Sequence, residues 1–277
     1  MRVDHRRAMK RDEFRIFQSG VAGITAVGSD TRHVFSRHTH DQFGIGVIDR
    51  GAQKSASGRG TVEAGAGDTI TVNPGEVHDG APIGDDGRAW RMLYFDPPLI
   101  AHAAADLSLG RTENYEFSRP ALTDAAVADC FGRLFSAVTQ AAAKENRLRS
   151  EELLLTLLPM LLAPRPTVGR AVANGVFTAK RLIDDCPTAP FTLADLAQVS
   201  GLSRFQVLRS FVRATGLTPH AYLVQRRIDL AWRLIAARTA LAPAAAASGF
   251  ADQSHMTRIF VRKYGLSPGA YAAAAAA

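Results

Sequence analysis

Cysteine is scarce in this sequence, since its 277 residues contain only Cys130 and Cys186. The two form no C-x-x-C pair, which argues against a disulfide framework and against a cysteine zinc site. Sparse cysteine is typical of proteins in a reducing compartment, and we therefore expect a cytoplasmic protein.

Long apolar runs are also missing. No uninterrupted apolar stretch reaches the roughly 20 residues that a membrane-spanning helix needs, and the densest one, 153–163, contains Pro159. The N-terminal segment MRVDHRRAMKRDEFR is charged and lacks an apolar centre, so it does not resemble a secretory signal. We therefore expect no membrane partner.

Charge is distributed unevenly over a composition of 47% hydrophobic and 21% charged residues, which suits a globular protein of two domains. From residue 170 to the end lie 13 of the 33 Lys and Arg residues but only five of the 26 Asp and Glu residues. This region therefore has a net charge of +8, whereas the preceding residues carry −1. A basic module attracts polyanions such as nucleic acid, although a solvated basic surface would have the same composition.

Two patterns divide the chain before residue 164. Short apolar runs separated by Gly, Pro, Asn and Asp predict β-strands between Phe14 and Phe95, arranged as a sandwich or a barrel. Helices are expected between about Thr123 and Leu162. Two apolar stripes mark them: Val127, Cys130, Phe131, Leu134, Phe135 and Val138, then Leu153, Leu154, Leu157, Leu158, Leu161 and Leu162. Such stripes usually form core, but a helix pair between two domains is also able to form a dimer interface.

A proline-containing segment separates this region from the basic one. In APRPTVG, residues 163–169, two prolines and a glycine interrupt the helix and indicate a linker. The sequence therefore predicts an N-terminal domain over 1–163, a linker over 164–170 and a helical domain over 171–277. We expect the terminal run of alanines to be frayed.

The basic region contains an internal repeat. Residues 209–222 read RSFVRATGLTPHAY and residues 258–271 read RIFVRKYGLSPGAY, with nine identities in fourteen positions at an offset of 49. A repeat of this length indicates two copies of one small helical motif. Upstream of the first copy, Thr192 and Asp195 have the spacing of a capping box, Gly201 suits a turn, and Ser203 suits the next N-cap. In the second copy Gly249 supplies the turn and Asp252 the cap. Helix, short turn, helix is the helix-turn-helix pattern.

The second helix of each unit carries side chains that suit DNA. The first offers Arg204, Gln206 and Arg209, and the second offers Gln253, Ser254, His255 and Arg258. Arginine can read guanine through two hydrogen bonds, glutamine can read adenine, and both can bind phosphate. Taken singly, these arginines could equally form surface ion pairs, and it is their occurrence in two matched copies that favours DNA binding.

The region from Thr192 to Tyr271 resembles the AraC/XylS family of bacterial transcription regulators. The resemblance rests on LADLAQVSGLSRFQVLRSFVRATGLTPHAYLVQRRIDLA and on ASGFADQSHMTRIFVRKYGLSPGAY. It implies seven helices with two recognition helices in adjacent major grooves, and the family tendency is activation, for which we expect RNA polymerase as a partner. From the apolar helix stripes we expect a homodimer. By family position, the DNA-contacting residues would be Arg204, Phe205, Gln206, Arg209, Gln253, Ser254, His255 and Arg258.

The β-rich region resembles the small cupin-type barrel that many members of the family carry as an effector domain. The matching features are His38-Thr39-His40, Gly51, Gly67-Asp68 and Pro74-Gly75-Glu76-Val77-His78. We expect His38, His40 and His78 to line an effector pocket. Metal-binding cupins join such histidines with a glutamate shortly after the second, and that glutamate is missing here, so we expect neither a metal nor another cofactor.

The fold class expected is thus multidomain α+β: a cupin-like β-barrel with a helical dimerisation element, followed by an all-α domain of two helix-turn-helix units. The function expected is an effector-controlled transcription regulator that is not an enzyme. Two alternatives stay open. A metal-dependent cupin enzyme with an appended DNA-binding module would bind a metal and turn over a substrate. A non-specific architectural DNA binder would need neither a pocket nor base-reading side chains.

Overall fold

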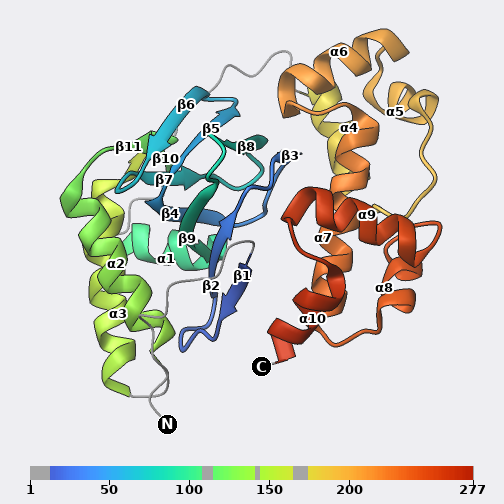
Figure 1. The fold of residues 1–277 in the computed structure, drawn as a ribbon. Helices are drawn as coiled ribbons and strands as arrows, with labels where there is room; N and C mark the ends of the chain where they lie inside the picture. The colour runs from blue at the N-terminus through green and yellow to red at the C-terminus, as the bar shows by residue number, and fades with distance from the viewer. Residues whose placement is uncertain (1–12, 108–114, 141–143, 165–173, 277) are drawn as a thin grey trace. The chain divides into compact units, whose positions relative to one another are not determined.

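The computed structural model describes residues 13–107, 115–140, 144–164 and 174–276 (Figure 1). The chain forms two compact units. The first comprises Met1–Val34, Asp41–Pro74 and Gly80–Arg165, and the second comprises Phe35–His40, Gly75–Asp79 and Pro166–Ala277. The charged N-terminal segment lies almost wholly outside the described residues. None of the described helices is long and apolar enough to cross a membrane.

Nine strands lie between Glu13 and Phe95, the region predicted to be β-rich, and three short strands that were not predicted follow after Phe95 in the described part of the chain. The strands of the β-rich region pair as two sheets rather than as one closed barrel. The six-stranded sheet has the order β1-β2-β9-β4-β7-β11, formed by Glu13–Phe17, Ile24–Thr31, Arg88–Phe95, Phe43–Arg50, Thr69–Val72 and Ala121–Leu122. The four-stranded sheet has the order β3-β8-β5-β6, formed by Phe35–His38, His78–Pro82, Ala52–Ser57 and Gly60–Gly65.

The middle of the six-stranded sheet is packed closely enough to require glycine. A Cβ built on Gly46 of β4 would lie 2.7 Å from the backbone oxygen of Arg91 on β9, which cannot move aside, and 2.1 Å from the sulfur of Met92. Strand β4 is buried at all but its last two residues, because it lies between β9 and β7 in the sheet. This burial explains why its sequence, FGIGVIDR, is apolar until its end.

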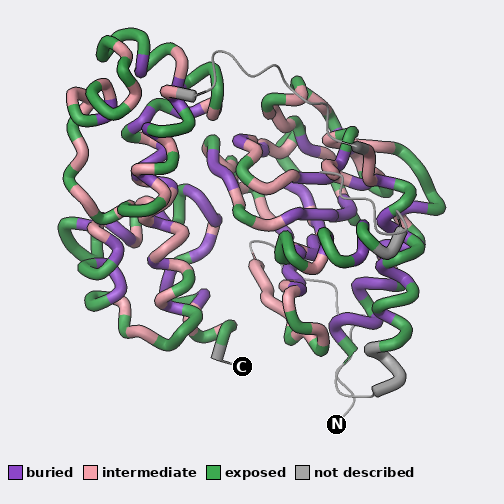
Figure 2. The backbone as a smooth tube through the Cα atoms, turned by 180° about the vertical axis from the view of Figure 1, so that it is seen from behind, coloured by how far each residue is buried: buried purple, intermediate pink, exposed green. Residues whose placement is uncertain are grey.

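The described part of the first unit also contains three α-helices: α1 (Pro97–Leu107), α2 (Ala125–Thr139) and α3 (Lys144–Leu157). Asp124 caps α2 by accepting a hydrogen bond from the backbone N–H of Ala126 at 2.9 Å. Both predicted apolar stripes join the core formed with the sheet, where Leu157 and Leu158 are fully buried. The buried residues recur at helical spacing along these helices (Figure 2). The expectation that the Leu153–Leu162 stripe forms a dimer interface is wrong, because its own chain already covers it.

The predicted linker begins in ordered structure. Pro164 is the last residue of β12 (Leu162–Pro164), which pairs with β10 (Tyr115–Phe117). Residues 165–173 lie outside the described part of the chain, so the boundaries 163 and 171 stay predictions.

The second unit contains seven described helices, the number that the family resemblance implies. They are α4 (Asn174–Asp185), α5 (Leu193–Ser200), α6 (Arg204–Thr215), α7 (Pro219–Ala236), α8 (Leu241–Ala247), α9 (Gln253–Tyr264) and α10 (Pro268–Ala276). Helix α10 contains the terminal alanines up to Ala276, and the expected fraying of this end stays a prediction. Alanine has the highest helix propensity, and the buried ring of Tyr271 anchors this helix.

Candidate nucleic-acid interface and histidine cluster

The first helix-turn-helix unit is built by two consecutive capping boxes. Thr192 Oγ1 accepts a hydrogen bond from the backbone N–H of Asp195 at 3.2 Å, and the Asp195 carboxylate accepts from the N–H of Thr192 at 2.7 Å. The Asp195 carboxylate also accepts a hydrogen bond from the Thr192 hydroxyl at 2.7 Å, and this bond, together with that from the Thr192 N–H, holds the pKa of Asp195 below its usual value. Gly201 ends α5 with a left-handed φ of 65°, and Ser203 begins α6 at once. The tight turn fixes the angle between the two helices.

Helix α6 presents one face to the core and another to solvent. Val207 and Phe211 are buried, whereas the predicted DNA-contacting residues Arg204, Phe205, Gln206 and Arg209 are all exposed. The guanidinium of Arg209 lies over the ring of Phe205, 5.4 Å from its centre. Gln206 has a second role, because its carboxamide oxygen accepts a hydrogen bond from the backbone N–H of Ser203 at 2.9 Å.

The second unit repeats this construction on α9. Asp252 caps the helix by accepting a hydrogen bond from the backbone N–H of His255 at 2.7 Å. Gln253, Ser254 and Arg258 are exposed. The half-buried ring of His255 meets the ring of Phe250 edge-on, with centres 5.4 Å apart. The structure thus brings four predicted residues together on each of the two helices.

The internal repeat has a structural meaning. In each copy it covers the end of the exposed helix, a glycine turn and the start of the next helix. Gly216 and Gly265 end α6 and α9 with φ values of 76° and 75°. The repeated aromatic pairs are buried in the same way, with ring centres 5.4 Å apart for Phe211 and Tyr222 and 5.8 Å apart for Phe260 and Tyr271.

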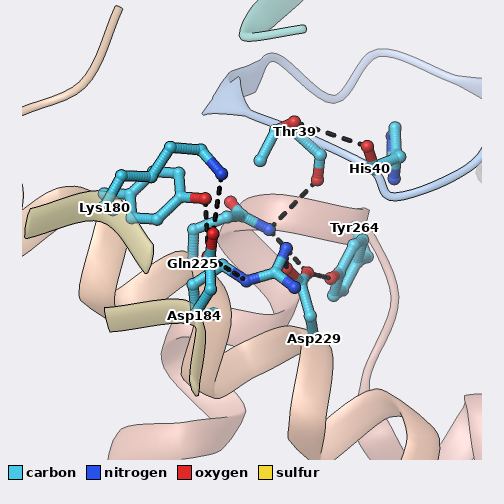
Figure 3. Close-up of polar contacts among 9 residues, drawn as sticks. Thr39, His40, Lys180, Asp184, Gln225, Asp229 and Tyr264 are labelled. Atoms are coloured by element: carbon cyan, nitrogen blue, oxygen red, sulfur yellow. Dashed lines mark hydrogen bonds and ion pairs between the residues drawn. The ribbon is translucent and has the colours of Figure 1, made fainter. Parts of the chain in front are cut away.

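Two carboxylates bind the connecting helix α7 to its neighbours (Figure 3). Asp184 of α4 accepts a hydrogen bond from the hydroxyl of Tyr222 at 2.7 Å and lies 3.3 Å from Arg226. Asp229 of α7 accepts from the hydroxyl of Tyr264 at 2.9 Å. Asp184 and Asp229 were not among the residues predicted from the sequence. The only available signal was that acidic residues are rare in this basic region.

The strand β3 belongs to the same compact unit as these helices. The carboxamide nitrogen of Gln225, which is fully buried, donates to the backbone carbonyl of Thr39 at 3.2 Å (Figure 3). The ammonium of Lys263 donates to the backbone carbonyl of Arg37. Burial lowers the pKa of Lys263 to about 8. Val77 belongs to the segment Gly75–Asp79, which is also part of this unit, and it lies in the apolar core of α4, α5 and α6.

Three histidines meet where β3 and β8 pair. His38, His40 and His78 each offer a ring nitrogen, and these atoms all lie within 4.8 Å of one another. Ring centres are 4.8 Å apart for His38 and His40, 4.4 Å for His38 and His78, and 5.3 Å for His40 and His78. Burial, together with His78 and His40, lowers the pKa of His38 well below its usual value. The structure therefore brings together the three residues expected at an effector site.

Known domains match most of the chain. The AraC-like ligand binding domain matches residues 21–158, and a helix-turn-helix domain matches residues 196–274. The uncharacterized HTH-type transcriptional regulator YbfI of Bacillus subtilis is 29% identical over 235 residues, which cover 80% of this chain and 81% of that protein. The arabinose operon regulatory protein of Escherichia coli is 28% identical over 216 residues, covering 75% of this chain and 72% of that protein.

A solved structure shares the architecture. An apo form of ToxT from Vibrio cholerae has a TM-score of 0.62 at 12% identity, covering 92% of this chain and 98% of that one. At this identity the similarity shows a common fold.

Proposed function

Because this chain belongs to the AraC family of transcriptional regulators, we propose that α6 and α9 read two successive major-groove segments of one operator. The family gives the general activity, which is transcription regulation by a protein with a ligand-binding N-terminal domain and a helix-turn-helix region. One observation carries the finer assignment. Arg209 and Arg258 are exposed at equivalent positions of two N-capped helices.

The exposed side chains divide into base readers and phosphate binders. Arg209 and Arg258 have the length and the paired donors to read guanine, and the carboxamide of Gln253 can pair with adenine. Arg204 and Ser254 lie in the first turns of their helices, where backbone N–H groups also favour phosphate. Phe205, with 65% of its surface exposed, supplies an apolar contact for a thymine methyl group. Gln206 and His255 complete the proposed interface.

Binding of the full-length protein to DNA from its own promoter tests this proposal. Fluorescence anisotropy at one fixed salt concentration should give an affinity at least about 10³-fold higher for the promoter than for shuffled DNA of the same composition. Equal affinity for both would contradict sequence reading and support the architectural alternative.

We propose that the small-molecule effector controls this binding, and that the chain regulates without catalysing a reaction. The support is the match of residues 21–158 to a ligand-binding domain and the regulatory role of the relatives. To regulate, the effector must bind two arrangements of the protein with different affinities. We also propose that the protein activates transcription through RNA polymerase. Its proposed location is the cytoplasm, where the DNA is found.

A homodimer is also proposed, on a different surface from the one first expected. Leu148 and Leu155 lie seven residues apart on α3, so they share one helical face, and 62% and 37% of their surfaces are exposed. Sedimentation of the full-length protein should show a dimer that is lost in the double variant Leu148→Glu, Leu155→Glu. A variant that remains dimeric would place the interface elsewhere.

A further inference from the structure

We propose that His38, His40 and His78 form a binding site for one first-row divalent cation, such as Zn²⁺, Co²⁺ or Ni²⁺. The site lies beyond the DNA-reading function and does not rest on it. It revises the expectation, drawn from the missing glutamate, that no metal binds here.

The spacing of the three rings suits a shared ion. In zinc sites the histidine nitrogens lie about 2.0–2.1 Å from the metal in a tetrahedral arrangement, which places the ring centres about 5 Å apart. The three observed separations, 4.8, 4.4 and 5.3 Å, bracket this value. Tetrahedral bonds of this length place the ligand nitrogens about 3.3 Å apart. The candidate nitrogens lie within 4.8 Å of one another, so side-chain rotation must bring them closer when they bind one ion.

Backbone hydrogen bonds fix the tautomers of two of these rings. The Nδ1 of His38 lies 2.8 Å from the carbonyl of Ser36, and the Nδ1 of His78 lies 3.0 Å from the carbonyl of Glu76. A carbonyl only accepts, so each Nδ1 carries the proton. In the neutral ring the lone pair is then on Nε2. Donation of the other ring nitrogen to a carbonyl is the arrangement that orients histidines in metal sites.

The identity of the ligands selects the class of metal. Imidazole favours zinc, copper, nickel and iron, whereas calcium and magnesium prefer oxygen ligands. Three histidines are a sufficient protein set for zinc, and they leave a coordination position for water or an added ligand. No carboxylate belongs to the cluster in the described part of the chain. The bound ion would therefore keep its positive charge and favour an anionic partner in that position.

Two of the ligands come from one strand and the third from its neighbour in the same sheet. His38 ends β3, His40 follows two residues later, and His78 begins β8, which pairs with β3. The side chain of His38 is buried, while His40 and His78 are partly exposed. A site of this kind is accessible from solvent and is held by backbone pairing.

Cobalt binding by the full-length protein tests the proposal directly. Protein treated with a chelator and then freed of it should take up one equivalent of Co²⁺, with the visible absorption of nitrogen-bound cobalt, and Zn²⁺ should displace it. His40→Gln and His78→Gln should each weaken Co²⁺ binding at least about ten-fold. The matched control is His220→Gln, since His220 is exposed near the start of α7. Uptake equal to wild type in both cluster variants, or no stoichiometric uptake by the wild type, would overturn the site.

A second measurement avoids variants that fail to fold. Diethyl pyrocarbonate modifies accessible histidines, and peptide mapping locates the modified residues. Zn²⁺ should protect His40 and His78 in the wild-type protein while leaving the modification of His220 unchanged. Equal modification of His40 and His78 with and without Zn²⁺ would also overturn the proposal.

Discussion

At the scale of single residues, Arg209 and Arg258 carry the proposed reading of bases. Each is exposed on the second helix of its unit, at the same position of the repeat. Replacing either with alanine should weaken operator binding by about 1–3 kcal/mol, because a two-bond contact to guanine is lost. Anisotropy titrations measure the change. Arg233→Ala, at an exposed position near the end of α7, controls for the lost charge and should have little effect.

The same titrations separate base reading from phosphate binding. If either arginine contacts only phosphate, its variant should lose affinity equally for operator and shuffled DNA, and the dependence on salt should become shallower. Variants that fold and retain full operator affinity would contradict both roles.

The sequence predicts the caps of these helices but not every role of the capping residues. Thr192, Ser203 and Asp252 cap as expected, because capping depends on residue type and local spacing. The hydrogen bond that the Ser203 N–H donates to the Gln206 carboxamide oxygen was not predicted, although Ser203 and Gln206 have the spacing of a capping box. The Gln206 side chain thus caps its own helix and is also proposed to contact DNA. No local sequence pattern predicts which of these two contacts the Gln206 side chain makes.

At the scale of the elements, two glycines near the second turn of the repeat, Gly265 and Gly269, are predicted to respond to alanine in opposite ways. Gly265 has a φ of 75°, which a side chain disfavours, so Gly265→Ala should lower the free energy of unfolding by about 1–2 kcal/mol. Gly269 lies within α10, where an added Cβ would meet only Ser267 Oγ at 4.0 Å. Gly269→Ala should therefore raise the free energy of unfolding by about 0.4–1 kcal/mol. Denaturant titrations that give both variants the same sign of change would contradict this account of the turn.

The leucines of α3 also have opposite predicted roles. Leu157 is fully buried, so Leu157→Ala should lower the free energy of unfolding by about 2–5 kcal/mol through the cavity it leaves. Leu148, with 62% of its surface exposed, should tolerate alanine with a change of at most about 0.5 kcal/mol. Thermal or denaturant unfolding distinguishes them. A small effect at Leu157 would restore the original idea that this stripe faces a partner.

Periodicity predicts which elements form and which faces are apolar, but not what those faces contact. The α2 and α3 stripes and the helix boundaries near Arg204 and Gln253 follow from local sequence. Whether a leucine stripe meets a sheet or a second subunit depends on residues far away in the chain. The separation of the strands into two sheets likewise depends on pairing between distant segments.

At the scale of the whole molecule, the second compact unit includes two segments from the β-rich region. Residues 35–40 and 75–79 join α4–α10 through Val77 and through the bonds that Gln225 and Lys263 make to backbone carbonyls. Gln225 and Thr39, for example, are 186 positions apart in the sequence. The sequence carries no local sign of these contacts, because they join residues that are far apart in the chain.

A fragment that begins near Arg170 should therefore bind operator DNA but unfold more easily than the same helices in the full chain. It should also fail to respond to an effector. Hydrogen exchange of the α7 amides measures the first effect, with faster exchange expected in the fragment because the buried side chain of Gln225 loses its bond to Thr39. Equal protection in fragment and full chain would show that these contacts contribute nothing to stability.

The central claim is that two matched helices read two neighbouring segments of one operator, and footprinting on the promoter tests it most directly. Hydroxyl-radical cleavage with the full-length protein should show two protected segments on one face of the DNA, centred about one helical turn, roughly 34 Å, apart. Arg209→Ala should weaken one segment and Arg258→Ala the other. A single protected segment, or protection spread evenly over any DNA supplied, would contradict the account.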